Sequence, residues 1–510
     1  MSRQLSRALR YWLGDLATFS RLVLKQPLRR YQLEPAAAIL RSVLQGQGHT
    51  FAVMMARQAG KNELSAQLEA YLLNLYRRAG GQLVKASPTY KPQTLNSILR
   101  LCDRLDNVWN TGQYRRREGY IVELDRARAF FFSAEPSARV VGATASLLLE
   151  GDEAQDIAPV KWEKDFTPMG ASTNVTTVFW GTAWTSSTLL AQRIAFLEQQ
   201  QAADRVQRVF RVDADEVAAE VPAYGDFVRA QTGRLGRNHP LIRTQFFLEL
   251  VDGSGGLFPL SRRALMRGGH SRRSIPEPGH HYALLIDVAG EDETAGSVVE
   301  RHLLENPRRD ATAITVVDVD VAARSAGGLR LYRVVDRKLV LGERHTTLHG
   351  QILALARLWH AGWVVVDATG VGAGLASFLV HALGDAARGG RVVRVEFSPG
   401  VKSDMGWAFV ALVETGRYQE YVEDETPETR QFWYEVEACK YEVGSGPEKR
   451  MRWGVWEAPA YDGLIARGHD DLLLSAALCT VLDRQPPPGG AVGDVVEVAD
   501  ALTEVDAGDW

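Results

Sequence analysis

Cysteine, net charge and long apolar runs are all scarce in this chain. Only three cysteines, Cys102, Cys439 and Cys479, occur among 510 residues, too far apart for a metal motif or a disulfide framework. That pattern favours an intracellular, reducing location. No run approaches the roughly 20 apolar residues that a membrane helix needs. The Arg-rich N-terminus also lacks the apolar core of a signal peptide, so we expect a cytosolic protein that does not bind membranes.

The charge balance excludes a protein that is basic over its whole surface. The formal net charge is -3 at pH 7, so any contact with nucleic acid must come from local clusters. Two clusters are candidates, "YRRREGY" with Arg115 to Arg117 and "RRALMRGGHSRR" from Arg262 to Arg273. A run of like charges more often forms a solvated face. With 45% hydrophobic and 24% charged residues, the composition is otherwise that of a globular protein.

Two stretches of the chain alternate short apolar runs with helical patterns, which indicates parallel α/β architecture. Near-continuous apolar runs are typical of strands that are buried on both faces. The first stretch has them at residues 50–56, 81–87, 145–152 and 174–182; the second has them at 282–290, 312–320, 329–336, 363–370 and 391–398, with a helical pattern at 348–362. The length of the chain agrees with two or three domains.

Residues 215–274 lie between these stretches, lack their rhythm, and are predicted to form a lid and linker. The boundaries that follow are a first domain over residues 1–214 and a second over 275–485. The last segment, 486–510, is predicted to be a disordered acidic tail. Its final residues, Ala491 to Trp510, include six acidic side chains and no Lys or Arg, a composition that does not fold alone.

The stretch "VMMARQAGKNE", Val53 to Glu63, resembles a phosphate-binding loop with two departures. The standard loop reads G-x-x-x-x-G-K-[ST], whereas Met55 replaces the first glycine and Asn62 replaces the hydroxyl residue. An apolar strand precedes the loop, Gly60 and Lys61 supply the turn and the ammonium group, and leucines at helical spacing follow. A plain strand–turn–helix with a surface lysine would show the same degenerate pattern.

A second element of nucleotide chemistry follows in "SLLLEGDEAQD". Asp152 and Glu153 stand at the end of its apolar strand. Phosphoryl transfer to water needs one carboxylate to hold magnesium and another to orient or deprotonate the water. An Asp-Glu pair is common at strand ends and is weak evidence alone. Together with the loop, it favours an ATPase.

The second half of the chain places carboxylates at the ends of separate elements. Asp287 ends "YALLID", Asp367 ends "WVVVD", and Asp470 and Asp471 open the helix of "GHDDLLLSAAL". Such acids can converge on the two divalent ions of a nuclease, and Asp310 is a less certain further member. Any one of them alone is more often a turn-forming residue or a helix cap. The order strand-Asp, strand-Asp, helix-Asp resembles an RNase H-like nuclease.

Taken in order, these motifs resemble the large terminase subunit of tailed bacteriophages, the DNA-packaging motor. Many members carry an R-Q-x-G-K variant of the loop, and "RQAGKN" from Arg57 to Asn62 fits it. Nearly the whole chain is covered, through the further stretches "RRYQLEP", "ASPTYKPQT", "FWGTAWTSS" and "NHPLIRTQFFLELVDGSGGLF". The resemblance implies a P-loop ATPase domain of the RecA/ASCE type with a parallel sheet, joined to an RNase H-like nuclease domain.

The resemblance also implies roles for individual residues. Gln32 would read the adenine, Arg57 would contact the γ-phosphate, and the amide oxygen of Asn62 would replace the hydroxyl ligand of magnesium. The implied nucleotide-binding set is Gln32, Arg57, Gln58, Ala59, Gly60, Lys61, Asn62 and Asp152, with Gly181 and Thr182 as coupling residues. The implied catalytic residues are Glu153, Asp287, Asp367 and Asp471, and the implied metal ligands are Asp287, Asp367, Asp470, Asp471 and Asp310.

The implied cofactors are ATP and Mg2+, with Mn2+ also supporting nuclease activity. The implied partners are double-stranded DNA, the portal protein of the procapsid, and a small terminase subunit that recognises the genome. Packaging would need a homo-oligomeric ring docked on the procapsid in the bacterial cytoplasm, while the isolated chain is expected to be monomeric. Two alternatives remain: a cellular helicase-nuclease of DNA repair, and a nucleotide-gated DNA-binding scaffold without catalysis.

Overall fold

A computed structural model describes residues 11–140, 142–251, 254–288, 311–321, 329–341, 343–444, 449–456 and 469–487. The chain divides into two compact units. Unit 1 comprises Met1–Gly253 and Val443–Lys449, and unit 2 comprises Ser254–Glu442 and Arg450–Trp510. Asp310 and most of the predicted acidic tail lie outside the described residues. None of the described helices is long and apolar enough to cross a membrane.

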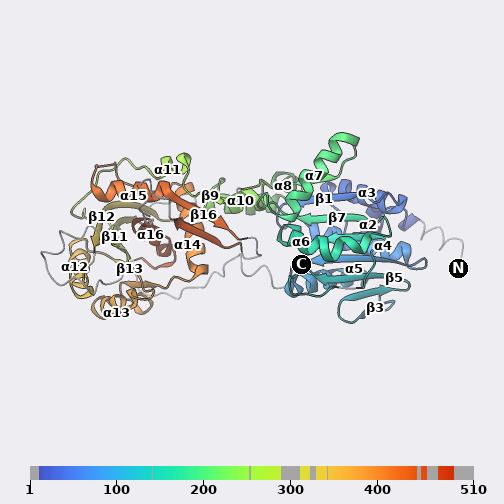
Figure 1. The fold of residues 1–510 in the computed structure, drawn as a ribbon, viewed down its shortest axis with the longest axis horizontal. Helices are drawn as coiled ribbons and strands as arrows, with labels where there is room; N and C mark the ends of the chain where they lie inside the picture. The colour runs from blue at the N-terminus through green and yellow to red at the C-terminus, as the bar shows by residue number, and fades with distance from the viewer. Residues whose placement is uncertain are drawn as a thin grey trace, which may run out of the picture. The chain divides into compact units, whose positions relative to one another are not determined.

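Unit 1 is built on a sheet with the strand order β3-β4-β5-β2-β6-β7-β1-β8 (Figure 1). Its strands are β1 (Thr50–Met55), β2 (Gly81–Ser87), β3 (Tyr114–Arg117), β4 (Ile121–Leu124), β5 (Ala127–Ser133), β6 (Leu148–Gly151), β7 (Thr176–Gly181) and β8 (Val209–Val212). Neighbours from β5 to β8 pair in parallel, whereas β3 and β4 extend the sheet in antiparallel fashion. Parallel strands end at one edge, and there the predicted nucleotide residues gather.

Helices cover both faces of this sheet, which explains the near-continuous apolar strands. Along β1, Phe51 and Val53 pack with the helices that precede and follow the strand, while Ala52 and Met54 pack with α7 on the other face. The helices of unit 1 are α2 (Leu16–Leu22), α3 (Arg30–Gln45), α4 (Lys61–Tyr76), α5 (Leu95–Leu105), α6 (Pro159–Lys161), α7 (Leu189–Asp204), α8 (Ala214–Glu220), α9 (Pro222–Leu235) and α10 (Pro240–Gln245). Short turns of other helix types are η1 (Tyr90–Thr94), η2 (Ala154–Asp156), η3 (Trp162–Phe166) and η4 (Thr167–Gly170).

Unit 2 contains a mixed sheet with the order β14-β13-β10-β11-β12-β15 (Figure 1). Its strands are β10 (Tyr282–Asp287), β11 (Ala311–Asp320), β12 (Leu331–Leu341), β13 (Trp363–Asp367), β14 (Val392–Val395) and β15 (Tyr418–Gln419). The pairs β10–β11 and β11–β12 are antiparallel, whereas β10–β13 and β13–β14 are parallel. A second, small sheet joins β9 (Ser254–Gly256), β16 (Cys439–Val443) and β17 (Met451–Val455).

Helices also cover both faces of the larger sheet of unit 2. One apolar core packs α12 and α13 against the sheet, and the other packs α14, α15 and α16 against the opposite face. The helices are α11 (Leu260–Met266), α12 (His345–Leu358), α13 (Gly372–Leu383), α14 (Pro399–Glu414), α15 (Pro427–Ala438) and α16 (Asp471–Ala477), with short turns η6 (Ala386–Arg388) and η7 (Leu478–Arg484). The two units thus have the α/β class predicted for a P-loop ATPase joined to an RNase H-like domain.

Every strand predicted from an apolar run is present, but two regions differ from simple expectation. Strands β3, β4 and β5, whose β3–β4 and β4–β5 pairings are antiparallel, come from a stretch that the apolar pattern did not mark. Residues 215–274, predicted to be lid and linker, contain α9 and α10 in unit 1 and α11 in unit 2. The helices α10 and α11 have only 6 and 7 residues, too few for a helical period to stand out in the sequence.

Candidate functional sites

The predicted phosphate-binding loop connects β1 to α4, as the strand–turn–helix pattern requires. Gly60 is the N-cap of α4 with φ 87°, a left-handed conformation that glycine adopts without strain. Lys61, the first residue of the helix, is 8% exposed. Its Nζ atom lies 2.6 Å from Oε1 of Glu153. The structure therefore brings together two residues that the sequence analysis placed in one site.

Asp152 and Glu153 follow β6, the strand that lies between β2 and β7. Asp152 is buried, and its carboxylate accepts hydrogen bonds from the Glu153 N–H at 3.1 Å and from the Ser97 hydroxyl at 3.4 Å. Burial alone would raise the pKa of Glu153, but the charge and hydrogen bond of Lys61 hold that pKa below its ordinary value. The ion pair with Lys61 therefore favours the ionised form of Glu153.

Gln32 lies over the loop, next to the glycine that precedes the lysine. Its Nε2 donates to the Gly60 carbonyl at 3.0 Å, and its Oε1 accepts from the Arg29 N–H at 2.9 Å. A Cβ atom on Gly60 would lie 2.8 Å from that Nε2. The hydroxyl of Tyr31 donates to the Ala59 carbonyl at 2.9 Å. The start of α3 therefore positions the loop, and the proposed adenine contact of Gln32 stays a prediction.

Arg57 ties the loop to α10. Its Nη1 donates to Oε1 of Gln245 at 2.9 Å, and its backbone N–H donates to the Gln245 carbonyl at 2.8 Å. The Tyr224 hydroxyl, from α9, donates to the Arg57 carbonyl at 2.8 Å. The neighbouring Gln58 has φ 61°, so the backbone reverses sharply here. Sequence reasoning missed Tyr224 and Gln245, because their contacts join segments far apart in the chain.

Asn62 offers an oxygen atom suited to a magnesium ion. Its Oδ1 is buried and has no hydrogen-bond partner among the described residues. Leaving a buried acceptor unpaired costs about 1–3 kcal/mol, which a ligand in this position would recover. An amide oxygen is a hard ligand of the kind that magnesium prefers, and the Asp152 carboxylate is another. The residues present therefore fit a magnesium ion beside the loop.

The predicted coupling residues end β7, the strand between β6 and β1. The Thr182 N–H donates to Oε1 of Gln155 at 3.2 Å, and a Cβ atom on Gly181 would lie 2.2 Å from that same oxygen. Gln155 follows Glu153 by two residues and was not predicted as a site residue. Its position links the acidic pair to the end of β7.

In unit 2, two of the predicted carboxylates lie side by side at the ends of neighbouring strands. In the parallel pair β10–β13, Ile286 is the partner of Val366, so the next residues, Asp287 and Asp367, are neighbours. Side chains alternate along a strand, and both acids therefore point to the face that carries Leu285 and its core. This convergence is the one predicted from the sequence.

Asp470 and Asp471 reach the same face from α16. The helix packs there through Ser475, whose hydroxyl donates to the Leu285 carbonyl at 2.8 Å. Asp470 is the N-cap residue of α16, yet its side chain makes no capping hydrogen bond. Asp471 accepts from the Ala311 N–H at 3.1 Å, and His469 Nδ1 lies 3.7 Å from it. The ordinary capping explanation therefore does not account for Asp470.

Burial and, for Asp287, the neighbouring acids disfavour the charged forms of Asp287, Asp367 and Asp470. The pKa of Asp287 is raised well above its ordinary value, first by burial and then by the charges of Asp471, Asp367 and Asp470. Burial also raises the pKa values of Asp367 and Asp470. Lys402 offsets part of this charge, with its Nζ 3.8 Å from Oδ2 of Asp470. The cluster therefore favours the addition of a cation.

No group of three or more His, Cys, Asp or Glu side chains in the described ranges stands in an arrangement that could already hold a metal ion. The predicted ligands lie on one face of the sheet but are not arranged as a complete metal-binding site. Asp367 uses Oδ1 to accept the Thr369 N–H at 2.8 Å, the contact of an ordinary turn-forming residue. The available donors are nevertheless carboxylate oxygens, and their negative charge exceeds the nearby positive charge. Both features fit Mg2+ or Mn2+.

Glu435 is a further acid beside this cluster that sequence reasoning missed. It lies on α15, and its Oε2 accepts the Leu473 N–H in the first turn of α16 at 2.9 Å. Burial first, and then the charges of Asp471 and Asp470, raise its pKa to about 8. A Cβ atom on Gly454 would lie 2.4 Å from Oδ2 of Asp470, so that glycine leaves room for the acid.

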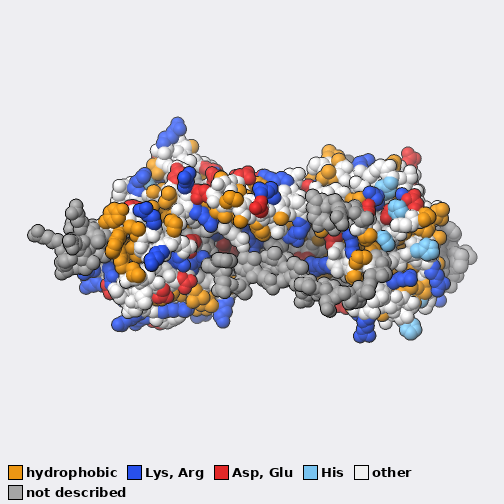
Figure 2. All heavy atoms as spheres, turned by 180° about the vertical axis from the view of Figure 1, so that it is seen from behind, with side chains coloured by type: hydrophobic (Ala, Val, Ile, Leu, Met, Phe, Trp, Pro, Cys, Tyr) orange, Lys and Arg blue, Asp and Glu red, His pale blue; other side chains and the backbone are white. Residues whose placement is uncertain are grey.

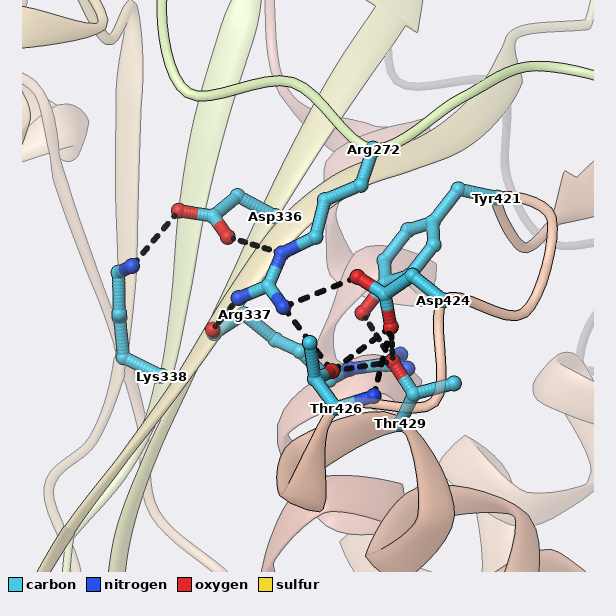
Figure 3. A network of polar contacts seen from close by, with 8 residues as sticks. All are labelled: Arg272, Asp336, Arg337, Lys338, Tyr421, Asp424, Thr426 and Thr429. Atoms are coloured by element: carbon cyan, nitrogen blue, oxygen red, sulfur yellow. Dashed lines mark hydrogen bonds and ion pairs between the residues drawn. The ribbon is translucent and has the colours of Figure 1, made fainter.

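The basic cluster from Arg262 to Arg273 is not a free nucleic-acid surface. Each of its arginines has an acidic partner: Arg262 with Glu414, Arg263 with Glu437, Arg267 with Glu423, Arg272 with Asp336 and Asp424, and Arg273 with Glu277 and Asp318. Figure 3 shows Arg272 within its network, where it also donates to the Arg337 carbonyl at 2.9 Å. These arginines are engaged in ion pairs within unit 2.

The other basic cluster, Arg115 to Arg117, lies exposed on the edge strand β3. Arg117 is within 3.4 Å of Glu123, and Arg116 donates to the Gly119 carbonyl. Figure 2 shows basic side chains interspersed with acidic and apolar ones over the face in view. Neither cluster therefore identifies a DNA-binding surface.

No protein-family model matches the sequence, and no curated protein matches it. Among solved structures, those of bacteriophage large terminases are similar to this chain at low TM-scores. One, from a thermophilic bacteriophage, covers 89% of this chain and 98% of its own, with 10% identity and a TM-score of 0.45. The HK97 bacteriophage large terminase covers 92% and 99%, with 12% identity and a TM-score of 0.37. The magnesium-bound large terminase nuclease of thermophilic phage G20c covers 44% and 96%, with 18% identity and a TM-score of 0.30. At these values the likeness adds no weight to the chemistry, which rests on the side chains.

Proposed function

We propose that this chain is an ATP-driven DNA translocase joined to a metal-dependent endonuclease, acting as the large subunit of a bacteriophage DNA-packaging terminase. The observation that carries the proposal is the 2.6 Å contact between Lys61 and Glu153 at the loop between β1 and α4. It joins the two groups that phosphoryl transfer to water requires, a phosphate-binding ammonium and a water-orienting carboxylate. A plain strand–turn–helix would leave its lysine on the surface, whereas Lys61 is buried and has an acidic partner.

In the ATPase site, the residues have separate tasks. Lys61 binds the β- and γ-phosphates together with the N–H groups of the loop, and Arg57 contacts the γ-phosphate. Asp152 and Asn62 would hold magnesium, which would supply neutralising charge to the phosphates when bound. Glu153 orients the attacking water and takes its proton, a role that suits an ionised carboxylate. Gln32 reads the adenine, and Gly181 and Thr182 couple hydrolysis to movement.

In the nuclease site, Asp287, Asp367, Asp470 and Asp471 hold divalent ions, with Asp310 as a further candidate. Such ions stabilise the attacking and leaving oxygens of phosphodiester cleavage when bound. Lys402 and Glu435 lie beside these acids; the first limits their repulsion, and the second holds the first turn of α16. The excess of buried carboxylate over positive charge supports this assignment.

The remaining parts of the proposal follow from the packaging role. The substrate is double-stranded DNA, which the nuclease cuts from a concatemer after translocation into the procapsid. The partners are the portal protein, a small terminase subunit that recognises the genome, and further copies of this chain in a ring. The place of action is the bacterial host cytoplasm, at the procapsid.

The purified chain should release phosphate from ATP in the presence of Mg2+, and should cut linear double-stranded DNA with Mg2+ or Mn2+. A chelator should abolish both activities. Metal-dependent phosphate release without any DNA cleavage would be consistent with the translocase assignment and would contradict the nuclease assignment. Absence of both in a folded protein would favour the non-catalytic scaffold.

A cellular helicase-nuclease is the main alternative, and the topology of unit 2 weighs against it. A helicase of that kind would place a second parallel, RecA-like sheet after the first. Instead, β10, β11 and β12 are antiparallel neighbours at the centre of the unit 2 sheet. That arrangement, with acids at the ends of β10 and β13, supports a nuclease domain.

A further inference from the structure

Gln155 is a buried amide between the acidic pair and the end of β7. It lies in η2, two residues after Glu153, and is 4% exposed. Its Nε2 donates to Oε2 of Glu153 at 2.7 Å and to Oδ2 of Asp156 at 3.2 Å. Its Oε1 accepts the Thr182 N–H at 3.2 Å. The amide nitrogen of Gln155 therefore donates to two acids, and its amide oxygen accepts from the backbone at the end of β7.

The end of β7 is shaped around this amide. A Cβ atom on Gly181 would lie 2.2 Å from Oε1 of Gln155 and 2.6 Å from Cδ2 of Leu190. Real Cβ contacts are not that short, so any larger residue here would force the side chains of Gln155 and Leu190 to shift. The glycine that the sequence marked as a coupling residue is thus explained by its contact with Gln155.

The two oxygens of Glu153 have different partners. Oε1 lies against Lys61, and Oε2 accepts from Gln155. Nucleotide phosphates would compete with Glu153 for the ammonium group of Lys61, because both are anions. Gln155 has no charge to be drawn away, so it would keep its hydrogen bond to Glu153 when Lys61 turns to the phosphates.

We propose that Gln155 is a positioning residue for the ATPase reaction: it holds Glu153 in place and links that carboxylate to Gly181 and Thr182 at the end of β7. This inference rests on the proposed ATPase function. It goes beyond it by naming the physical connection between the water-orienting acid and the coupling strand. An uncharged amide is neither an acid nor a base at neutral pH, so Gln155 acts through Glu153.

The direct test compares Gln155→Ala with the parent and with Gln192→Ala, an exposed glutamine on α7, as the control. Loss of a positioning contact of this kind should lower kcat by about 100-fold, since small misplacements of reacting groups have effects of that size. The KM for ATP should change little, because the phosphate loop is untouched. Binding of a fluorescent ATP analogue should match the parent.

A second variant, Gln155→Glu, gives a readout that a purely structural role would not produce. The groups facing this position are Glu153 and Asp156 on its own segment, Lys61 on α4, and Lys449 of the same unit. Among these charges a new carboxylate repels Glu153 when ionised, whereas its protonated form can donate to it. The activity of Gln155→Glu relative to the parent should therefore rise as pH falls from 8 to 6.

A double-mutant cycle tests the link to β7. Gly181→Ala should lower kcat, because its methyl group displaces the Gln155 amide. In the Gln155→Ala background the same change should cost much less, so the two effects should be non-additive.

Parent-like kcat in folded Gln155→Ala, or a pH-independent ratio for Gln155→Glu, would overturn the inference while leaving the ATPase intact. A raised KM with unchanged kcat would also overturn it, since that marks a binding residue. A parent without ATPase activity would instead overturn the proposed function. If Gln155→Ala does not fold, the pH ratio of Gln155→Glu decides.

Discussion

The two candidate sites treat their carboxylates in opposite ways. In unit 1, Glu153 lies 2.6 Å from Lys61, and its pKa is held below the ordinary value. In unit 2, burial and three neighbouring acids raise the pKa of Asp287, with Lys402 as partial compensation. The first site carries its own counterion, which the proposed reaction would exchange for the phosphates of a nucleotide. The second has a surplus of negative charge, which an external cation can neutralise.

The largest expected effect comes from removing an acid from the second site. Asp367→Ala takes away a central carboxylate, so DNA cleavage should fall by orders of magnitude. ATP hydrolysis should persist, because Lys61, Asp152 and Glu153 belong to unit 1. Plasmid nicking and phosphate release, measured on the same preparation, check both statements.

The matched control is Asp404→Ala, an exposed acid on α14 that lies outside the cluster. It should leave both activities unchanged. Asp287→Ala and Asp471→Ala should behave like Asp367→Ala, whereas Asp310→Ala should only weaken metal binding. Parent-like cutting by Asp367→Ala would mean that these acids are ordinary turn residues.

Breaking the ion pair of the first site should have a nearly equal effect on the other activity. Lys61→Ala removes the phosphate-binding charge, and Glu153→Gln removes the carboxylate that orients water, so each should abolish ATP hydrolysis. Glu153→Gln should still bind ATP, because its amide keeps the shape of the site. Phosphate release and nucleotide binding are the measurements, with the exposed Lys164→Ala as control. Near-normal turnover in either variant would remove the ATPase assignment.

The convergence of Asp287 and Asp367 could be predicted because each follows an apolar run long enough for one buried strand. The carboxyl ends of parallel strands meet at one edge, so two such acids come together without knowledge of the rest of the fold. A different pattern, the strand–turn–helix of a phosphate-binding loop, predicted Lys61 in the same site as Asp152. Local patterns were sufficient where the site residue follows a strand directly or lies in such a loop.

Residues that act through distant contacts could not be predicted in this way. Glu435 meets the Leu473 N–H across 38 positions of the chain, and nothing in its own helix marks that contact. The cluster containing Arg262 looked basic because its partner Glu414 lies 152 positions away. A run of sequence shows the charge of a segment, whereas the fold decides which charges are neutralised.

A smaller effect on ATPase activity should show whether the Asn62 side chain is an oxygen ligand of magnesium or only occupies space. If its unpartnered Oδ1 contacts magnesium, Asn62→Ser should keep ATPase activity within several-fold, because serine supplies the usual hydroxyl ligand. Asn62→Leu, of similar size but without oxygen, should lose about 10- to 100-fold. ATPase rates across a magnesium titration measure this. Equal rates in both variants would show that the position does not touch the metal.

The smallest expected effect is also the sharpest form of the comparison: neutralising one acid should change stability with opposite sign in the two units. The pKa of Asp287 is raised in the folded chain. Its contribution to stability is therefore present below its ordinary pKa and is lost as pH rises through the raised value. Asp287→Asn should stabilise metal-free unit 2, increasingly from pH 5 to pH 8.

The pKa of Glu153 is lowered, so its stabilisation is present above its ordinary pKa and is lost as pH falls through the lowered value. Glu153→Gln should then destabilise nucleotide-free unit 1 over the same range. Each shift should be on the order of 1 kcal/mol per unit of pKa change, or about 2–4 °C in Tm for domains of this size.

Amide hydrogen exchange in a chelator, read separately for peptides of each unit, measures both effects in one protein. Added Mg2+ should then protect unit 2 of the parent more than unit 2 of Asp287→Asn, because binding to the folded state alone stabilises it. If both variants shifted in the same direction, the contrast between a paired and an unpaired carboxylate site would be wrong.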